Sequence, residues 1–61
     1  MTHTYYVLEL LNAAGDWRQQ IRSSSLTSLQ RDKAVMDATG GQRTRIVRVI
    51  ETTTVKREVV Q

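Results

Sequence analysis

The sequence predicts a two-layer α+β domain, in which an antiparallel sheet of three to four strands carries one helix on one face. Three observations predict it. Val, Ile, Thr and aromatic residues are concentrated in three segments, one capped helical segment separates the second from the third, and no proline interrupts any of them. The expected order is β-β-α-β with an extended C-terminal strand, in a single domain over residues 1–61.

The first two predicted strands, Thr4 to Leu11 and Trp17 to Ser23, are joined by a hairpin loop over Asn12 to Asp16. Gly15 is the loop residue expected to adopt a positive φ. Strict alternation along the second strand gives one face that we expect to be core and one polar face. The core face would carry Trp17, Gln19 and Ile21, and the polar face Arg18, Gln20 and Arg22.

The predicted helix runs from about Ser28 to Thr39. Thr27 is the expected N-cap, because Gln30 three residues later completes a Thr-x-x-Gln capping box. Gly40-Gly41 is expected to end the helix, with a glycine in the left-handed conformation.

Residues Arg43 to Val60 contain no Gly, Pro or Asn and are rich in Val, Ile and Thr. A single straight strand of that length would span roughly 60 Å, too long for so small a body. Either a bend near Glu51 to Thr54 returns the tail to the sheet, or the tail extends and pairs with a second chain. The lack of turn residues favours the second interpretation.

The small size of the chain and the apolar residues on both faces of its strands predict a homodimer or higher oligomer. A chain of 61 residues has a small core, and the usual supports are missing, because cysteine is absent and His3 is the only histidine. Apolar residues lie on both faces of the first and third strands. The residues expected at the interface are Val7, Leu11, Ile46 and Ile50.

Catalysis, metal binding and a cofactor are not expected. A general acid–base needs a group that titrates near neutrality, and the lone His3 lies next to the N-terminus, while the six carboxylates are dispersed. The N-terminus has no basic region or cleavage site typical of a signal peptide, and no apolar stretch is long enough to cross a bilayer. The expected location is the cytoplasm, with no membrane partner.

The candidate binding site is a group of arginines on predicted strands with nearby aromatic rings. Guanidinium groups on adjacent strands can converge on one phosphate or carboxylate, and an aromatic ring can stack on a nucleobase. The more ordinary interpretation is that these arginines keep an open sheet face soluble and that the aromatics pack in the core. The candidate ligand-binding residues are Arg18, Arg22, Arg45, Arg48, Tyr5 and Trp17.

Four segments together resemble small accessory proteins of temperate phages: Trp17-Arg18, Ser25 to Ala38, Arg45 to Val49, and Arg57 to Val60. The resemblance implies a non-enzymatic protein in the host cytosol that neutralises a host component. One form is a sponge for a nucleotide immune signal such as an ADP-ribose derivative; the alternative is a protein–protein inhibitor of a host enzyme. A small nucleic-acid-binding protein is a further alternative, against which the net charge of only +3 argues.

Overall fold

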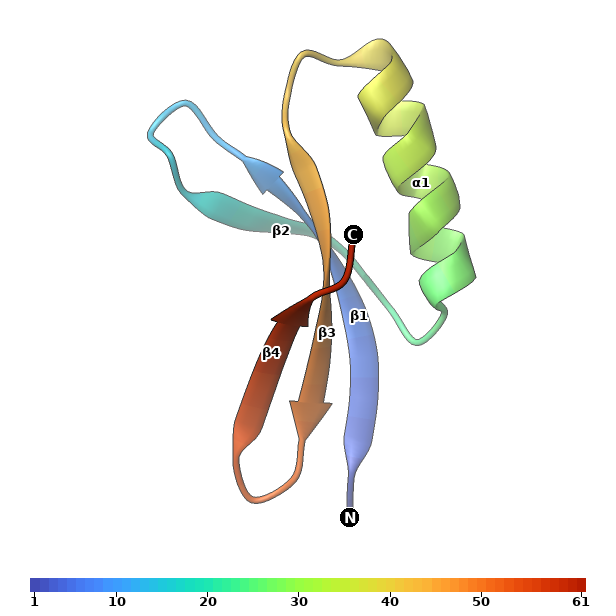
Figure 1. Ribbon diagram of the computed structural model, residues 1–61, viewed down its shortest axis with the longest axis vertical. Helices are drawn as coiled ribbons and strands as arrows, with labels where there is room; N and C mark the ends of the chain where they lie inside the picture. The colour runs from blue at the N-terminus through green and yellow to red at the C-terminus, as the bar shows by residue number, and fades with distance from the viewer.

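The computed structural model describes all residues 1–61 and confirms the predicted α+β class (Figure 1). Four strands form one antiparallel sheet in the order β2-β1-β3-β4, and a single helix packs against it. The elements are β1 (His3–Leu11), β2 (Trp17–Ser23), α1 (Leu26–Thr39), β3 (Thr44–Glu51) and β4 (Val55–Val59). The central strands β1 and β3 contain most of the buried residues, whereas the edge strands β2 and β4 are largely exposed.

The core between the helix and the sheet is small. Leu8, Ile46 and Leu29 are fully buried at its centre, and Tyr6, Leu26, Met36 and Val60 pack around them. We term this side of the sheet the helix face. Because side chains alternate along a strand, the neighbours of Leu8 and Ile46 in sequence point to the opposite side. No helix or strand covers that side, which we term the open face (Figure 1).

The β1–β2 hairpin forms as the sequence predicts. Asn12 organises its loop, because the Asn12 side-chain oxygen accepts hydrogen bonds from the backbone N–H groups of Ala14 and Asp16. Gly15 has a φ of 87°, in the left-handed region, which confirms its predicted role.

A β-bulge changes which side chains of β2 share a face. Leu8 pairs with Ile21, but Glu9 pairs with Gln19, so Gln20 is an extra residue in β2. Directly paired residues lie on the same side of a sheet, and the extra residue therefore reverses the alternation. The predicted faces of β2 are wrong for this reason. Trp17 and Arg22 lie on the open face, whereas Arg18 and Ile21 lie on the helix face.

The helix begins and ends differently from the prediction. Its N-cap is Ser25, whose hydroxyl accepts a hydrogen bond from the Ser28 N–H, and Thr27 lies inside the helix. At the other end, Gly40 donates its N–H to the Met36 carbonyl with a φ of −117°, so no left-handed glycine terminates α1. The helix has neither the length nor the apolar character needed to span a bilayer.

The C-terminal segment folds back onto its own sheet, so the favoured prediction of an extended tail is wrong. Thr52 donates its backbone N–H to the Thr54 carbonyl, which closes a tight turn without Gly, Pro or Asn. β4 then pairs antiparallel with β3. The expected surplus of apolar surface is also smaller than predicted, because Val7 and Ile46 are buried within one chain.

Candidate functional site

The open face is buried in its centre although no element covers it. Val7, Val47 and Val49 form a cluster in which each residue is at most 3% exposed. Polar and aromatic side chains cover these valines instead of a second layer of backbone. The residues of this covering layer are Tyr5 and Glu9 from β1, Trp17 and Arg22 from β2, Arg45 from β3 and Arg57 from β4.

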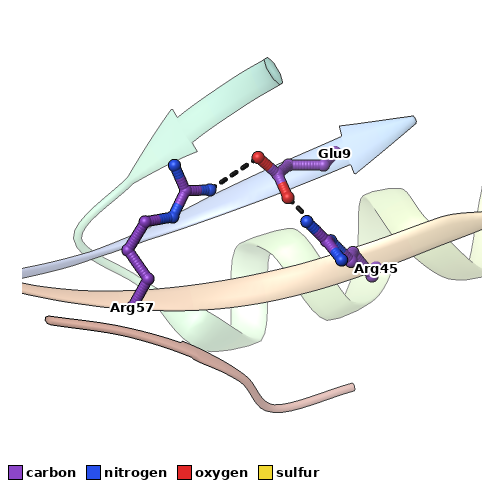
Figure 2. Close-up of polar contacts among 3 residues, drawn as sticks. All are labelled: Glu9, Arg45 and Arg57. Carbon is purple, nitrogen blue, oxygen red and sulfur yellow. Dashed lines mark hydrogen bonds and ion pairs between the residues drawn. The ribbon is translucent and has the colours of Figure 1, made fainter. Parts of the chain in front are cut away.

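Glu9 links two arginines of the covering layer to each other (Figure 2). Its Oε1 accepts a hydrogen bond from Nε of Arg45 and its Oε2 accepts one from Nη2 of Arg57, each at 2.7 Å. Arg57 reaches Glu9 from β4, so its side chain crosses β3. Only 7% of the Glu9 side chain is exposed, compared with 28% for Arg45 and 53% for Arg57.

The environment of Glu9 favours its ionised form. Burial raises the pKa of the carboxyl group, but the hydrogen bonds and charges of Arg45 and Arg57 together outweigh burial and hold the pKa below its ordinary value. Glu9 therefore remains an anion that fixes two guanidinium groups in place. Each of its two oxygens accepts a hydrogen bond from one arginine.

Two arginines of the open face lie over aromatic rings. The guanidinium carbon of Arg22 is 3.8 Å from the centroid of the Tyr5 ring, and that of Arg45 is 4.2 Å from the Trp17 ring. At these distances the cation is attracted by the negative face of the ring, which holds the guanidinium group over it. The rings thus position the cations, a role that differs from the predicted direct stacking on a nucleobase.

Tyr5 is itself positioned by a second polar contact. Its hydroxyl donates a hydrogen bond to Oε1 of Glu51 at 2.8 Å. This hydrogen bond, with a smaller contribution from burial, raises the pKa of Tyr5 above its ordinary value. The ring that supports Arg22 is therefore anchored at both its backbone and its hydroxyl.

The structure separates the six predicted ligand-binding residues into two groups. Tyr5, Trp17, Arg22 and Arg45 share the open face. Arg18 and Arg48 lie on the helix face, because their strand partners are Leu10 and Tyr6. The predicted convergence of four arginines is therefore wrong, and its cause is the β2 bulge together with the ordinary alternation of β3.

Two residues of the open face, Glu9 and Arg57, were not predicted from the sequence as part of the site. A glutamate within an apolar strand, Tyr5 to Leu11, was a signal for a buried charge that needs a cationic partner. Arg57 lies 48 positions from Glu9, and only the strand order brings the two together.

A shallow cavity of about 170 Å³ lies away from the open face, between the end of α1 and the sheet. Its lining carries no charged group and consists of Leu10, Met36, Thr39, Gly40, Gln42 and Thr44.

Comparison with known proteins gives no assignment, because no protein-family model, curated protein or solved structure matches the chain. The structure also contains no group of three or more His, Cys, Asp or Glu side chains that could hold a metal ion. The open face is the place where arginines and aromatic rings of four strands come together, and we take it as the candidate functional site.

Proposed function

We propose that this protein is a non-enzymatic binding protein that holds a phosphate-bearing small ligand, of the nucleotide class, against its open face. The observation that carries the proposal is the state of Arg22. Its guanidinium is held over the Tyr5 ring at 3.8 Å and forms no ion pair with any carboxylate. A planar, oriented guanidinium with free edge donors is suited to bidentate recognition of a phosphate group.

Arg45 and Arg57 support the same chemistry. Glu9 accepts one N–H from each of them, which leaves the remaining guanidinium N–H groups as donors. The open face carries three guanidinium groups against the two carboxylates of Glu9 and Glu51, so one positive charge is uncompensated. The sign of this excess favours an anion, and the Glu9 contacts reduce the conformational freedom that the arginines would lose on binding.

The same geometry indicates how a nucleobase would be held. Arg22 and Arg45 cover the inner aromatic rings, so a base would stack on the outer surface of a guanidinium plane and not directly on Tyr5 or Trp17. Sequestration of a nucleotide signal, the role implied by the resemblance to phage anti-defence proteins, is the biological form of this proposal.

Isothermal titration calorimetry against ADP-ribose, AMP and a cyclic dinucleotide tests the proposal, with an Arg22→Gln variant and an Arg18→Gln control. The two substitutions remove the same charge from the same strand, but Arg18 lies on the helix face. Loss of one charge-assisted contact is expected to weaken binding about 10- to 100-fold in Arg22→Gln. Binding by Arg18→Gln is expected to equal that of the unmodified protein.

Two results would contradict the proposal. One is the absence of measurable heat with all three nucleotides. The other is an equal loss of affinity in both variants, because only net charge would then matter. Binding to oligonucleotides that weakens steeply with salt, with no binding of mononucleotides, would favour the nucleic-acid alternative.

A further inference from the structure

The edge strand β4 is exposed along its whole length. All five of its residues are exposed, including Val55 at 62% and Val59 at 59%, which are among the few large apolar side chains left in contact with water. Which backbone groups of β4 point to this free edge follows from its hydrogen bonds with β3. Val60 donates its N–H to the Ile46 carbonyl, and hydrogen-bonded pairs alternate along an antiparallel ladder.

It follows that the pairs Arg48–Glu58 and Ile50–Lys56 exchange the hydrogen bonds between β3 and β4. The N–H and C=O groups of the other β4 residues point away from β3. Those residues are Val55, Arg57 and Val59. The free edge of β4 is therefore a row of unpaired backbone donors and acceptors at three alternate positions.

We propose that β4 pairs antiparallel with β4 of a second copy of this chain, in the register that places Arg57 opposite Arg57 of the second copy. This register opposes Val55 to Val59 and Lys56 to Glu58 at both ends of the ribbon. All three outward-facing residues become hydrogen-bonded pairs, and the two exposed valines cover each other. The sequence Val-Lys-Arg-Glu-Val is thus complementary to itself in side chain, charge and backbone.

Two features remove the objections to this register. The two copies of Arg57 face each other, but each guanidinium is drawn across β3 to Glu9 of its own chain at 2.7 Å, away from the shared edge. Lys56 forms no ion pair within the chain, and Glu58 has only a long one with Arg48 at 3.6 Å, so both are available to a partner.

The other edge of the sheet does not offer the same complementarity. β2 contains the bulge at Gln20, which interrupts a regular ladder, and a self-pairing centred there would oppose Arg18 to Arg22. A dimer through β4 gives a continuous sheet with the two open faces on one side. The proposal rests on the β4 edge alone and does not depend on the proposed ligand.

The register can be tested by reversing the charges of Lys56 and Glu58 and measuring association by sedimentation velocity. A short β-ribbon is a small interface, so association is expected at concentrations from about 1 to 500 µM. Lys56→Glu and Glu58→Lys each oppose like charges at two symmetric positions and are expected to weaken association on the order of 10- to 30-fold. The double variant restores opposite charges and is expected to regain association. An equimolar mixture of the two single variants is expected to form a heterodimer.

Two further variants exclude simpler explanations. Arg31→Glu reverses a charge on α1 and changes the net charge as much as Lys56→Glu does, and it is expected to leave association unchanged. Val59→Pro removes an outward-facing N–H that β3 does not use, so the fold should persist by circular dichroism while association is lost. A monomer at every concentration would overturn the proposal. So would a double variant no better than the single ones, or a Val59→Pro variant that still associates.

Discussion

Replacing Glu9 by glutamine is the most informative single perturbation of the open face. The substitution keeps the size of the side chain and removes its charge. In the native protein the carboxylate accepts hydrogen bonds from Arg45 and Arg57, and only 7% of the side chain is exposed. Glutamine has one carbonyl oxygen to offer, and its amide group would point N–H donors at guanidinium donors.

The expected loss of stability depends on how exposed Arg45 and Arg57 are. Removing one member of a fully buried ion pair costs about 3–5 kcal/mol, because the other charge stays buried without a partner. Here the side chains of Arg45 and Arg57 are 28% and 53% exposed and can turn partly to water. We therefore expect Glu9→Gln to lower the free energy of unfolding by about 2 kcal/mol. This is a large fraction of the roughly 3–5 kcal/mol available to so small a domain.

Thermal unfolding followed by circular dichroism measures this loss, and a decrease of about 8–16 °C in Tm is expected. Urea unfolding followed by the fluorescence of Trp17, the single tryptophan, provides a second probe next to Arg45.

The pKa of Glu9 is lowered by folding, so its stabilising contribution is fully present above the pKa of the unfolded chain, about 4.3. It is lost as the pH falls through the folded-state pKa, and the two proteins should converge in stability at low pH.

The control for this experiment is Asp16→Asn, which makes the same chemical change at an exposed loop position. It is expected to change the stability by less than about 0.5 kcal/mol. A Glu9→Gln variant as stable as the unmodified protein at pH 7 would show that the ion pairs of Glu9 do not stabilise the fold. A stability difference that persists unchanged down to pH 2 would refute the electrostatic part of it.

Three smaller predictions follow from local geometry. Ser25→Ala should lower the free energy of unfolding, measured with urea, by about 1 kcal/mol, because Ser25 is the N-cap of α1. Thr27→Ala should lower it by much less, and a larger loss in Thr27→Ala than in Ser25→Ala would indicate that Thr27 is the cap. Gly15→Ala should destabilise the protein by about 1–2 kcal/mol, since φ is 87° there, and an unchanged Tm would contradict this. Glu51→Ala should lower the pKa of Tyr5 toward its ordinary value in an ultraviolet titration, because it removes the oxygen that accepts the Tyr5 hydrogen bond; an unchanged titration would show that this hydrogen bond is unimportant.

The elements of the fold could be predicted because each is specified locally. Val, Ile and aromatic residues mark the strands, Gly15 marks the hairpin, and the helix lies between two polar breaks. The turn at Thr52 to Thr54 could not be predicted in the same way. Threonine favours strands, and the return of β4 depends on its pairing with β3, which is a tertiary contact.

The candidate site was harder to predict, because one bulge reverses the orientation of every later residue in β2. Without Gln20 as an extra residue, Arg18 and Arg22 would share a face; with it, only Arg22 joins Tyr5. The contact between Glu9 and Arg57 depends on strand order, which the residues of either strand do not encode alone. The predicted dimer remains a prediction, now placed at the edge of β4.

We propose that the open face binds an anionic ligand through its arginines. Two-dimensional NMR of the arginine Nε–Hε groups during a titration with ADP-ribose tests it most directly. Saturable shifts of the Arg22 and Arg45 signals are expected, whereas the signal of Arg18, which lies on the helix face, should not change. Signals that stay in place throughout the titration, or shifts confined to Arg18 and Arg31, would contradict it.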